Sequence, residues 1–232
     1  MPAWWETLTS YSPHDLLLFS ERVYWRLFAL NNEALWPGQW PALAAGLALI
    51  VLTLRPVGRA EQVSGLILAA AWALVAWSFL WRYYAPINPV AVYAAWLAGI
   101  EAALLAGFAL VRPAMLVPDR SHGEAGRRIG LVLLFWAVVL HPLLAPLDGR
   151  PWMQAEIFAL TPDPTALATL GVLLAASPGP ARLALLALPW LWCLASAATM
   201  LTLGAWSAAA PPAMAAMAVA LALLASRRGA RR

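Results

Sequence analysis

Two ionisable residues stand inside long apolar stretches of this sequence. Glu101 is the only formally charged residue in the stretch 90–111, and His141 lies in the apolar stretch that begins at Ile129. A charged side chain costs about 2.5–3.5 kcal/mol at the centre of a bilayer by insertion scales, so each must face protein or water. We expect Glu101 and His141 to form a charge-assisted pair or a proton relay. Alternatively, His141 only marks the end of a helix that is kinked by Pro142.

A second set of polar residues surrounds the start of a short apolar segment, 165–176. Asp163 as N-cap, with a proline after it at the first helical position, makes a typical helix start. The segment would be about 18 Å long as a helix, which is too short to cross a hydrocarbon core alone. Its positive N-terminal end favours anions, and short interrupted segments are common at the substrate sites of transporters. The polar residues predicted on the same side are Arg82, Asn88, Glu156 and Asp163.

Two interpretations of this segment are open. Arg82, Asn88 and Asp163 could recruit a ligand to the outer side, or residues 156–160 could complete the segment as an ordinary membrane helix. Further along the chain, residues 183–206 carry a mildly polar stripe that includes Cys193 and Ser196. Such side chains more often bond to the preceding helical turn or to a neighbouring helix than to a substrate.

The motifs of the common enzyme classes are missing from the sequence. It has no P-loop, HExxH, GxSxG or CxxC pattern, and the single cysteine, Cys193, excludes an intrachain disulfide and a thiolate metal cluster. Only three histidines are present, so an intramembrane zinc site of three histidines is not expected. We predict no catalytic residue, no metal ligand and no cofactor.

The composition identifies a membrane protein. Hydrophobic residues make up 63% of the 232 positions, charged residues make up 11%, and the mean hydropathy is +0.73. The pI near 9.8 could indicate nucleic-acid binding, but the arginines fall at the ends of apolar segments, as membrane topology requires. We therefore exclude nucleic acid as a partner and expect the lipid bilayer instead.

The elements that would position these residues are seven membrane-spanning helices in one all-α bundle. Residues 1–35 are predicted as amphipathic helices on the outer membrane surface, with Trp4, Trp5, Tyr24 and Trp25 as interface anchors. The bundle covers residues 36–226, and residues 227–232 form a basic cytoplasmic tail. The predicted spans are 36–54, 63–81, 90–111, 129–147, 165–176, 183–206 and 212–225.

The arginines predict the orientation of the bundle. When loops are assigned alternately, one side holds Arg55, Arg59, Arg112, Arg120, Arg127, Arg128, Arg182, Arg227, Arg228, Arg231 and Arg232, and the other holds Arg22, Arg26, Arg82 and Arg150. The positive-inside rule makes the first side cytoplasmic. We expect a bacterial inner-membrane protein with its amino terminus outside and its carboxyl terminus in the cytoplasm.

The helix 90–111 is expected at the centre of the bundle. Small residues recur on it at a spacing of four, namely Ala91, Ala95, Gly99, Ala103 and Gly107. Such a ridge lets helix backbones approach closely. Glu101 would face the opposite way, because it lies two residues from Gly99.

Three stretches together resemble a family of bacterial integral membrane proteins known as a domain of unknown function. They are LLLFSERVYWRLFALNNEALWP, WRYYAPINPVAVYAAW and FALTPDPTALATLGVLL, and they follow one another in the same order over nearly the whole chain. One departure is FSER, where a proline would be expected after the serine. The resemblance implies a single domain of several spans and brings no activity, ligand or catalytic residue.

These observations favour binding or transport of a small solute or ion. Glu101 and His141 would gate the pathway, and Arg82, Asn88 and Asp163 would recruit the ligand. A second interpretation is an accessory or scaffold subunit of a membrane complex, or a homo-oligomer, based on the small-residue ridge and the aromatic outer face. A third is a membrane-embedded lipid-modifying enzyme that uses Glu101, His141 and Cys193.

Overall fold

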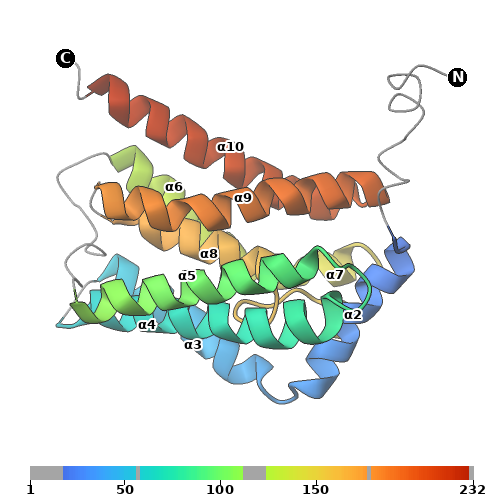
Figure 1. Cartoon of the computed structure of the whole chain (residues 1–232). Coiled ribbons are helices and arrows are strands. Elements are labelled where there is room, and N and C mark those ends of the chain that lie inside the picture. Colours follow the sequence, from blue (N-terminus) through green and yellow to red (C-terminus); the bar gives the residue numbers. More distant parts are fainter. Residues whose placement is uncertain (1–17, 56–57, 112–123, 177–178, 230–232) are drawn as a thin grey trace, which may run out of the picture.

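The computed structural model describes residues 18–55, 58–111, 124–176 and 179–229, and its secondary structure is helical (Figure 1). The elements in chain order are α2 (Glu21–Ala34), α3 (Gln39–Leu54), α4 (Ala60–Leu74), the π-helix η2 (Val75–Tyr84), α5 (Ala91–Val111), α6 (Glu124–Phe135), the π-helix η4 (Trp136–Leu140), the 3-10 helix η5 (His141–Leu143), α7 (Leu144–Leu147), the 3-10 helix η6 (Trp152–Gln154), α8 (Pro162–Ala175), α9 (Pro180–Leu203) and α10 (Trp206–Gly229). The described part of the chain contains no sheet, so the all-α prediction is confirmed.

Five helices are long and apolar enough to cross a membrane. They are Ala60–Tyr84, Ala91–Val111, Ala125–Leu147, Ala181–Leu203 and Trp206–Ala225. A sixth crossing is possible if α2 and α3, which are bent by 97° relative to each other, form one broken span. The described residues thus give five or six candidate spans, where about seven were expected. Two expected spans account for the difference. Segment 36–54 corresponds to α3, which has 16 residues and counts only together with α2, and segment 165–176 corresponds to α8, which has only 14 residues.

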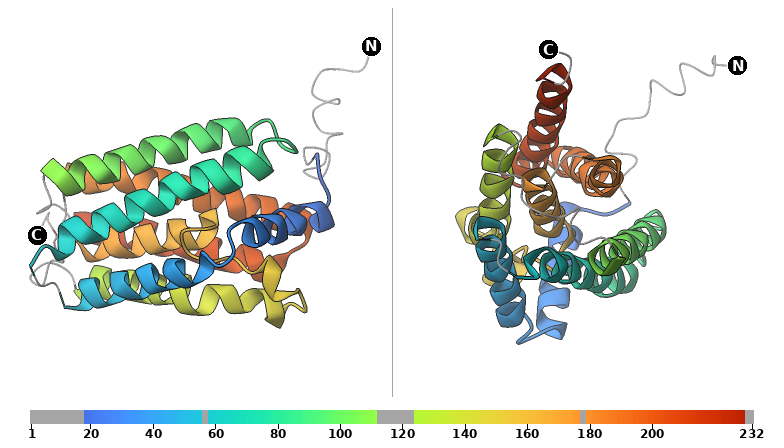
Figure 2. Two further views of the ribbon diagram at one scale, coloured as in Figure 1. Left: turned by 90° about the horizontal axis from the view of Figure 1, so that it is seen from below. Right: turned by 90° about the vertical axis from the view of Figure 1, so that its left-hand side faces the viewer.

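The helix ends sort into two groups along the bundle. The left view of Figure 2 shows the C-terminal ends of α3 and α5 at the same end of the molecule as the N-terminal ends of α4 and α9. The alternating assignment of loops used for the arginines therefore agrees with the path of the described chain. Which end faces the cytoplasm is still a prediction from the positive-inside rule.

The helix at the centre of the bundle is α8 and not α5. Every residue of Pro162–Ala175 is buried, and α8 contacts α3, α4, α6, α9 and α10. A helix that is apolar all round is covered either by lipid or by protein, and for α8 the cover is protein on every side. By contrast, 33% of the apolar window of α5 is buried, so α5 lies at the periphery (Figure 2). The expectation of a central helix at 90–111 was wrong.

The expectation that the small residues of α5 form its helix-packing surface was also wrong. The buried side chains of α5 are Ala91, Ala95, Ala98, Ala102, Leu105 and Ala109, which alternate at spacings of four and three, and Glu101, which lies beside Ala102 on the same side. A row at a spacing of four drifts around a helix with 3.6 residues per turn, so its later members leave the interface. Accordingly, a Cβ at Gly99 or Gly107 would meet nothing within 4 Å. Glu101 lies on the packed side of α5 and not opposite to it.

The close backbone contact in this bundle joins α6 and α8. A Cβ at Gly171 would lie 2.6 Å from the carbonyl oxygen of Gly130 and 2.9 Å from the amide nitrogen of Leu134, and a Cβ at Gly130 would clash with the carbonyl oxygen of Gly171. Each helix thus presents a glycine where the other backbone passes. This mutual approach lets α6 lie directly against the central helix.

Helix α2 packs into the protein. Tyr24 and Trp25 are only 3% and 4% exposed, so these rings do not act as surface anchors. Tyr24 stacks on Phe19 and meets the edges of Phe28 and Tyr84, which joins α2 to the end of η2. Trp4 and Trp5 lie outside the described residues.

Candidate functional site

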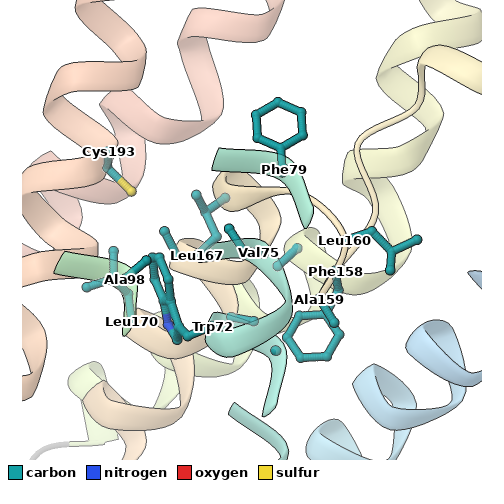
Figure 3. Packing of buried hydrophobic residues seen from close by; sticks show 14 of the residues in the cluster. Trp72, Val75, Phe79, Ala98, Phe158, Ala159, Leu160, Leu167, Leu170 and Cys193 are labelled. Atoms are coloured by element: carbon teal, nitrogen blue, oxygen red, sulfur yellow. The ribbon is translucent and has the colours of Figure 1, made fainter. Parts of the chain in front are cut away.

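A non-helical segment, 155–161, precedes α8 inside the bundle; it includes a turn at residues 158–160, and we call it the extended segment. Figure 3 shows its residues Phe158, Ala159 and Leu160 beside α8, with Val75 of η2 nearby. Non-helical backbone deep in a membrane protein is tolerated only where protein or water satisfies its polar groups. Residues 156–160 therefore do not extend α8 as a helix, in contrast to one of the two interpretations of the sequence.

Two asparagines of α2 satisfy the carbonyl groups of this region. Asn31 Nδ2 donates to Leu160 O at 3.0 Å, and Asn32 Nδ2 donates to Met153 O and Ala155 O, both at 2.9 Å. Both asparagines are fully buried. Helix α2 is thus the clamp that holds the extended segment in the bundle.

Threonines organise the turn into α8. Ala159 has a positive φ of 67°, and its N–H donates to Thr165 Oγ1 at 3.0 Å. Thr165 Oγ1 in turn donates to Thr161 O at 2.7 Å. The N-cap is Thr161, which is extended, and the helix starts at Pro162. Asp163 therefore lies in the first turn of α8 and is not its N-cap, although an acid is favourable at either position.

His141 lies at a break in the helix that continues α6. Pro142 has no N–H, and its ring would clash with a carbonyl oxygen one turn earlier in a regular helix. The chain instead widens into η4, where the N–H of His141 bonds to Trp136 O, and then tightens into η5. The regular helical hydrogen bonding is thus interrupted at His141-Pro142, although Ala125–Leu147 still forms one candidate span, and the buried His141 side chain lies next to Glu156.

His141, Glu156 and Asp163 form a buried cluster. His141 Nε2 lies 3.6 Å from Glu156 Oε2, and one ligand-type atom from each of the three residues lies within 4.8 Å of the other two. The three side chains are 1%, 5% and 2% exposed. Neither ring nitrogen of His141 has a hydrogen-bond partner in the described part of the protein. The cluster therefore combines two carboxyl groups with an imidazole that makes no hydrogen bond in the described residues.

Helix α9 fixes the Asp163 carboxylate. Trp192 Nε1 donates to Asp163 Oδ1 at 2.7 Å, and Ser196 Oγ donates to Asp163 Oδ2 at 2.6 Å. The two donors are four residues apart on α9, so they lie on the same face of the helix and reach both oxygens of one carboxylate. Short hydrogen bonds of this kind are typical of ionised acceptors.

A cavity lies on the other side of these two donors. It has a volume of about 170 Å³, and its wall includes Trp192 and Ser196. The rest of its lining is formed by Tyr24, Tyr84, Asn88, Val90, Ala91, Ala94, Ala195 and Thr199. It is thus a space with several hydroxyl and amide groups, separated from Asp163 by side chains that hydrogen-bond to Asp163.

The residues predicted from the sequence fall into three groups. Asp163 and His141 belong to the cluster, and Asn88 lines the cavity, where its Oδ1 accepts from the N–H of Val90 at 3.1 Å. Arg82 is exposed, with its guanidinium 5.5 Å from the centre of the Tyr83 ring. Glu101 is 1% exposed, and its Oε1 has no hydrogen-bond partner among the described residues. Within these residues His141 is paired with Glu156, and no ion pair joins it to Glu101.

Three contributors were not assigned to a site from the sequence. Glu156 was only placed on the same side as Asp163, Trp192 looks like a packing residue, and Ser196 looks like a residue that bonds within its own helix. The helix break at His141-Pro142 and the unusual Pro162-Asp163-Pro164 start were the available signals. Neither reveals which acid would lie next to the imidazole.

Comparison with known proteins gives a family and no further relatives. The model of the "Family of unknown function (DUF6064)" matches residues 21–231. No curated protein and no solved structure matches the chain. Because the match covers nearly all of the sequence, the chain belongs to this family of unknown function. Its five or six candidate spans make it a multi-pass membrane protein.

Proposed function

We propose that this protein binds a small cation at the cluster of His141, Glu156 and Asp163 and moves it across the membrane. The observation that carries the proposal is the charge of this cluster. Two carboxyl groups and an imidazole are buried together, and within the described residues neither Glu156 nor Asp163 has an arginine partner. Buried ionised carboxylates are costly unless a positive charge is present. A protonated His141 can neutralise one of the two carboxylates, and a bound cation supplies the remaining charge or, beside a neutral imidazole, all of it.

The nearby arginine is engaged elsewhere. Arg150 Nη2 lies 3.3 Å from Asp148 Oδ2, and its guanidinium lies 3.5 Å from the centre of the Trp25 ring. This pairing removes Arg150 as a neutralising partner for the cluster. It also positions a cation–π contact between the loop after α7 and helix α2.

The cavity supports a pathway to the cluster. Trp192 and Ser196 line this cavity and also hydrogen-bond to Asp163, so a cation that enters near Asn88 and Tyr84 would meet the side chains that hold the acid. A change of the Trp192 side chain would then join the cavity to the cluster. With the orientation expected from the arginines, this cavity faces the outer side of a bacterial inner membrane and the amino terminus lies outside.

The proposal is tested by cation flux into proteoliposomes that contain the purified chain. The panel comprises protons, Na⁺, K⁺, Mg²⁺, Mn²⁺ and Zn²⁺, with ion-sensitive dyes inside the vesicles. We expect flux of one cation above protein-free vesicles, and a reduction of at least tenfold in Asp163→Asn, which preserves side-chain shape. Glu33→Gln is the matched control, because Glu33 is an exposed acid on α2. Flux that is equal in Asp163→Asn and wild type, or no flux of any cation, contradicts the transport function.

A further inference from the structure

We infer that the cation held by His141, Glu156 and Asp163 is a single divalent ion of the first transition series, of the Mn²⁺, Fe²⁺ or Zn²⁺ type. This inference rests on the proposed function, since it names the class of cation that the same cluster binds. It goes beyond it by assigning three protein ligands and an open coordination position.

The spacing is close to that of a metal site. Ligands at about 2.0–2.2 Å from one tetrahedral metal lie roughly 3.3–3.6 Å apart. His141 Nε2 and Glu156 Oε2, at 3.6 Å, already have this separation. Because all the ligand atoms lie within 4.8 Å of one another, the other pairs need to close by at most about 1.5 Å.

The donor set selects the class of metal. Carboxylate oxygens alone suit Mg²⁺ and Ca²⁺, whereas an imidazole nitrogen suits Zn²⁺, Fe²⁺ and similar ions. Neither ring nitrogen of the buried His141 has a hydrogen bond in the described residues, and Nε2 lies 3.6 Å from a Glu156 oxygen, so a ligand between the two groups would satisfy both. The imidazole thus supplies the reason to prefer a transition ion. Two carboxylates bring the net charge that a divalent ion neutralises.

The carboxylate of Asp163 is held by hydrogen bonds from a neighbouring helix, as metal ligands usually are. Residues that hydrogen-bond to a metal ligand fix its orientation, and their loss commonly weakens metal binding 10–100-fold. Trp192 and Ser196 occupy one lone pair on each oxygen of Asp163, and each oxygen has further acceptor capacity. With three protein ligands, a fourth position is left for water or for an exchanging ligand, as in sites that release or use their metal.

The experiment measures binding of metal alone to the full chain in lipid nanodiscs after treatment with a chelator. Mn²⁺ is titrated by electron paramagnetic resonance of the free ion, and Zn²⁺ by competition with a fluorescent chelator. Na⁺ and Mg²⁺ are titrated by calorimetry as alternatives. The variants are His141→Ala and the shape-preserving Glu156→Gln, and Glu33→Gln is the control. Pulsed resonance of bound Mn²⁺ reports whether an imidazole nitrogen is coordinated.

We expect one transition ion per chain, with affinity at least 100-fold lower in both cluster variants and unchanged in the control. The nitrogen coupling in bound Mn²⁺ is lost in His141→Ala. If that variant fails to fold, the Glu156→Gln titration and the nitrogen coupling in the wild type still test whether the cluster binds the metal. Transition-ion binding that is unchanged in Glu156→Gln overturns the inference. Binding of Na⁺ or Mg²⁺ but not of Mn²⁺ or Zn²⁺ overturns it and leaves the proposed function standing, whereas binding of no cation overturns both.

Discussion

His141 Nε2 lies 3.6 Å from Glu156 Oε2, although one residue comes from a broken helix and the other from an extended segment. Two irregularities of the backbone produce this contact. Pro142 interrupts the helix directly after His141, and the chain from 155 to 161 is not helical. Both residues of the contact therefore stand where regular α-helical backbone is interrupted.

The hydrogen bond from Ser196 to Asp163 can be tested with Ser196→Ala. The substitution removes the donor 2.6 Å from Asp163 Oδ2 and leaves the carboxylate less well oriented. We expect Mn²⁺ affinity to fall by about 10–100-fold with little change in thermal stability. Thr202→Ala is the control, because the Thr202 hydroxyl donates to the carbonyl of Ala198 in its own helix. Equal affinity in Ser196→Ala and wild type would show that α9 does not orient the acid for binding.

The clamp of α2 on the extended segment can be tested with Asn32→Ala. This substitution leaves the carbonyl groups of Met153 and Ala155 without their shared donor. An unsatisfied buried polar group costs about 1–3 kcal/mol, so we expect a decrease in the free energy of unfolding of at least that size. Denaturant titration in detergent measures the change. Asn31→Ala, which frees only Leu160 O, should cost less, and the exposed Glu33→Ala should cost little. A reversed order would contradict the clamp.

The crossing of α6 and α8 can be tested with Gly171→Val. A Cβ at this position would lie 2.6 Å from Gly130 O, so the helices must separate. Overpacking of this kind costs about 1–3 kcal/mol, and we expect at least this loss of stability. Gly99→Ala is the matched control on α5, because nothing lies within 4 Å of its Cβ position. The control should be neutral or slightly stabilising, since alanine favours a helix. Equal loss in both variants would mean that α6 and α8 are not in close contact.

Glu101 can be separated from the cluster with Glu101→Met. Its carboxyl is buried on α5, and Oε1 has no hydrogen-bond partner in the described residues. Replacing an unsatisfied buried polar group with an apolar one of similar length is expected to raise the free energy of unfolding by about 1–3 kcal/mol. Mn²⁺ affinity at the cluster should not change. A loss of affinity would instead support the coupling of Glu101 with His141 that the sequence alone suggests.

Several features of the fold could be predicted from composition and hydropathy. Apolar stretches of span length and arginines at their ends indicate a helical membrane bundle, and five of the predicted spans coincide with candidate spans. The centre of the bundle could not be predicted, because it is decided by packing and not by length. Helix α8 is short and central, whereas α5 is long, carries Glu101 and lies at the periphery.

The candidate site was only partly predictable for a related reason. His141 and Asp163 stand out because ionisable residues next to helix breaks are unusual in apolar sequence. Their partner Glu156 follows no spacing rule, since it reaches the site through extended backbone. The role of Ser196 was hidden as well, because its hydroxyl bonds to another helix and not to its own preceding turn.

The most direct measurement is anomalous diffraction from crystals of the full chain grown with Mn²⁺, recorded on both sides of the manganese absorption edge. The account predicts one peak between η5, the extended segment and α8, about 2.0–2.3 Å from a nitrogen of His141 and from an oxygen each of Glu156 and Asp163. No anomalous peak at this position, with the His141 ring bonded to a protein group instead, would contradict the claim that the cluster holds a metal cation.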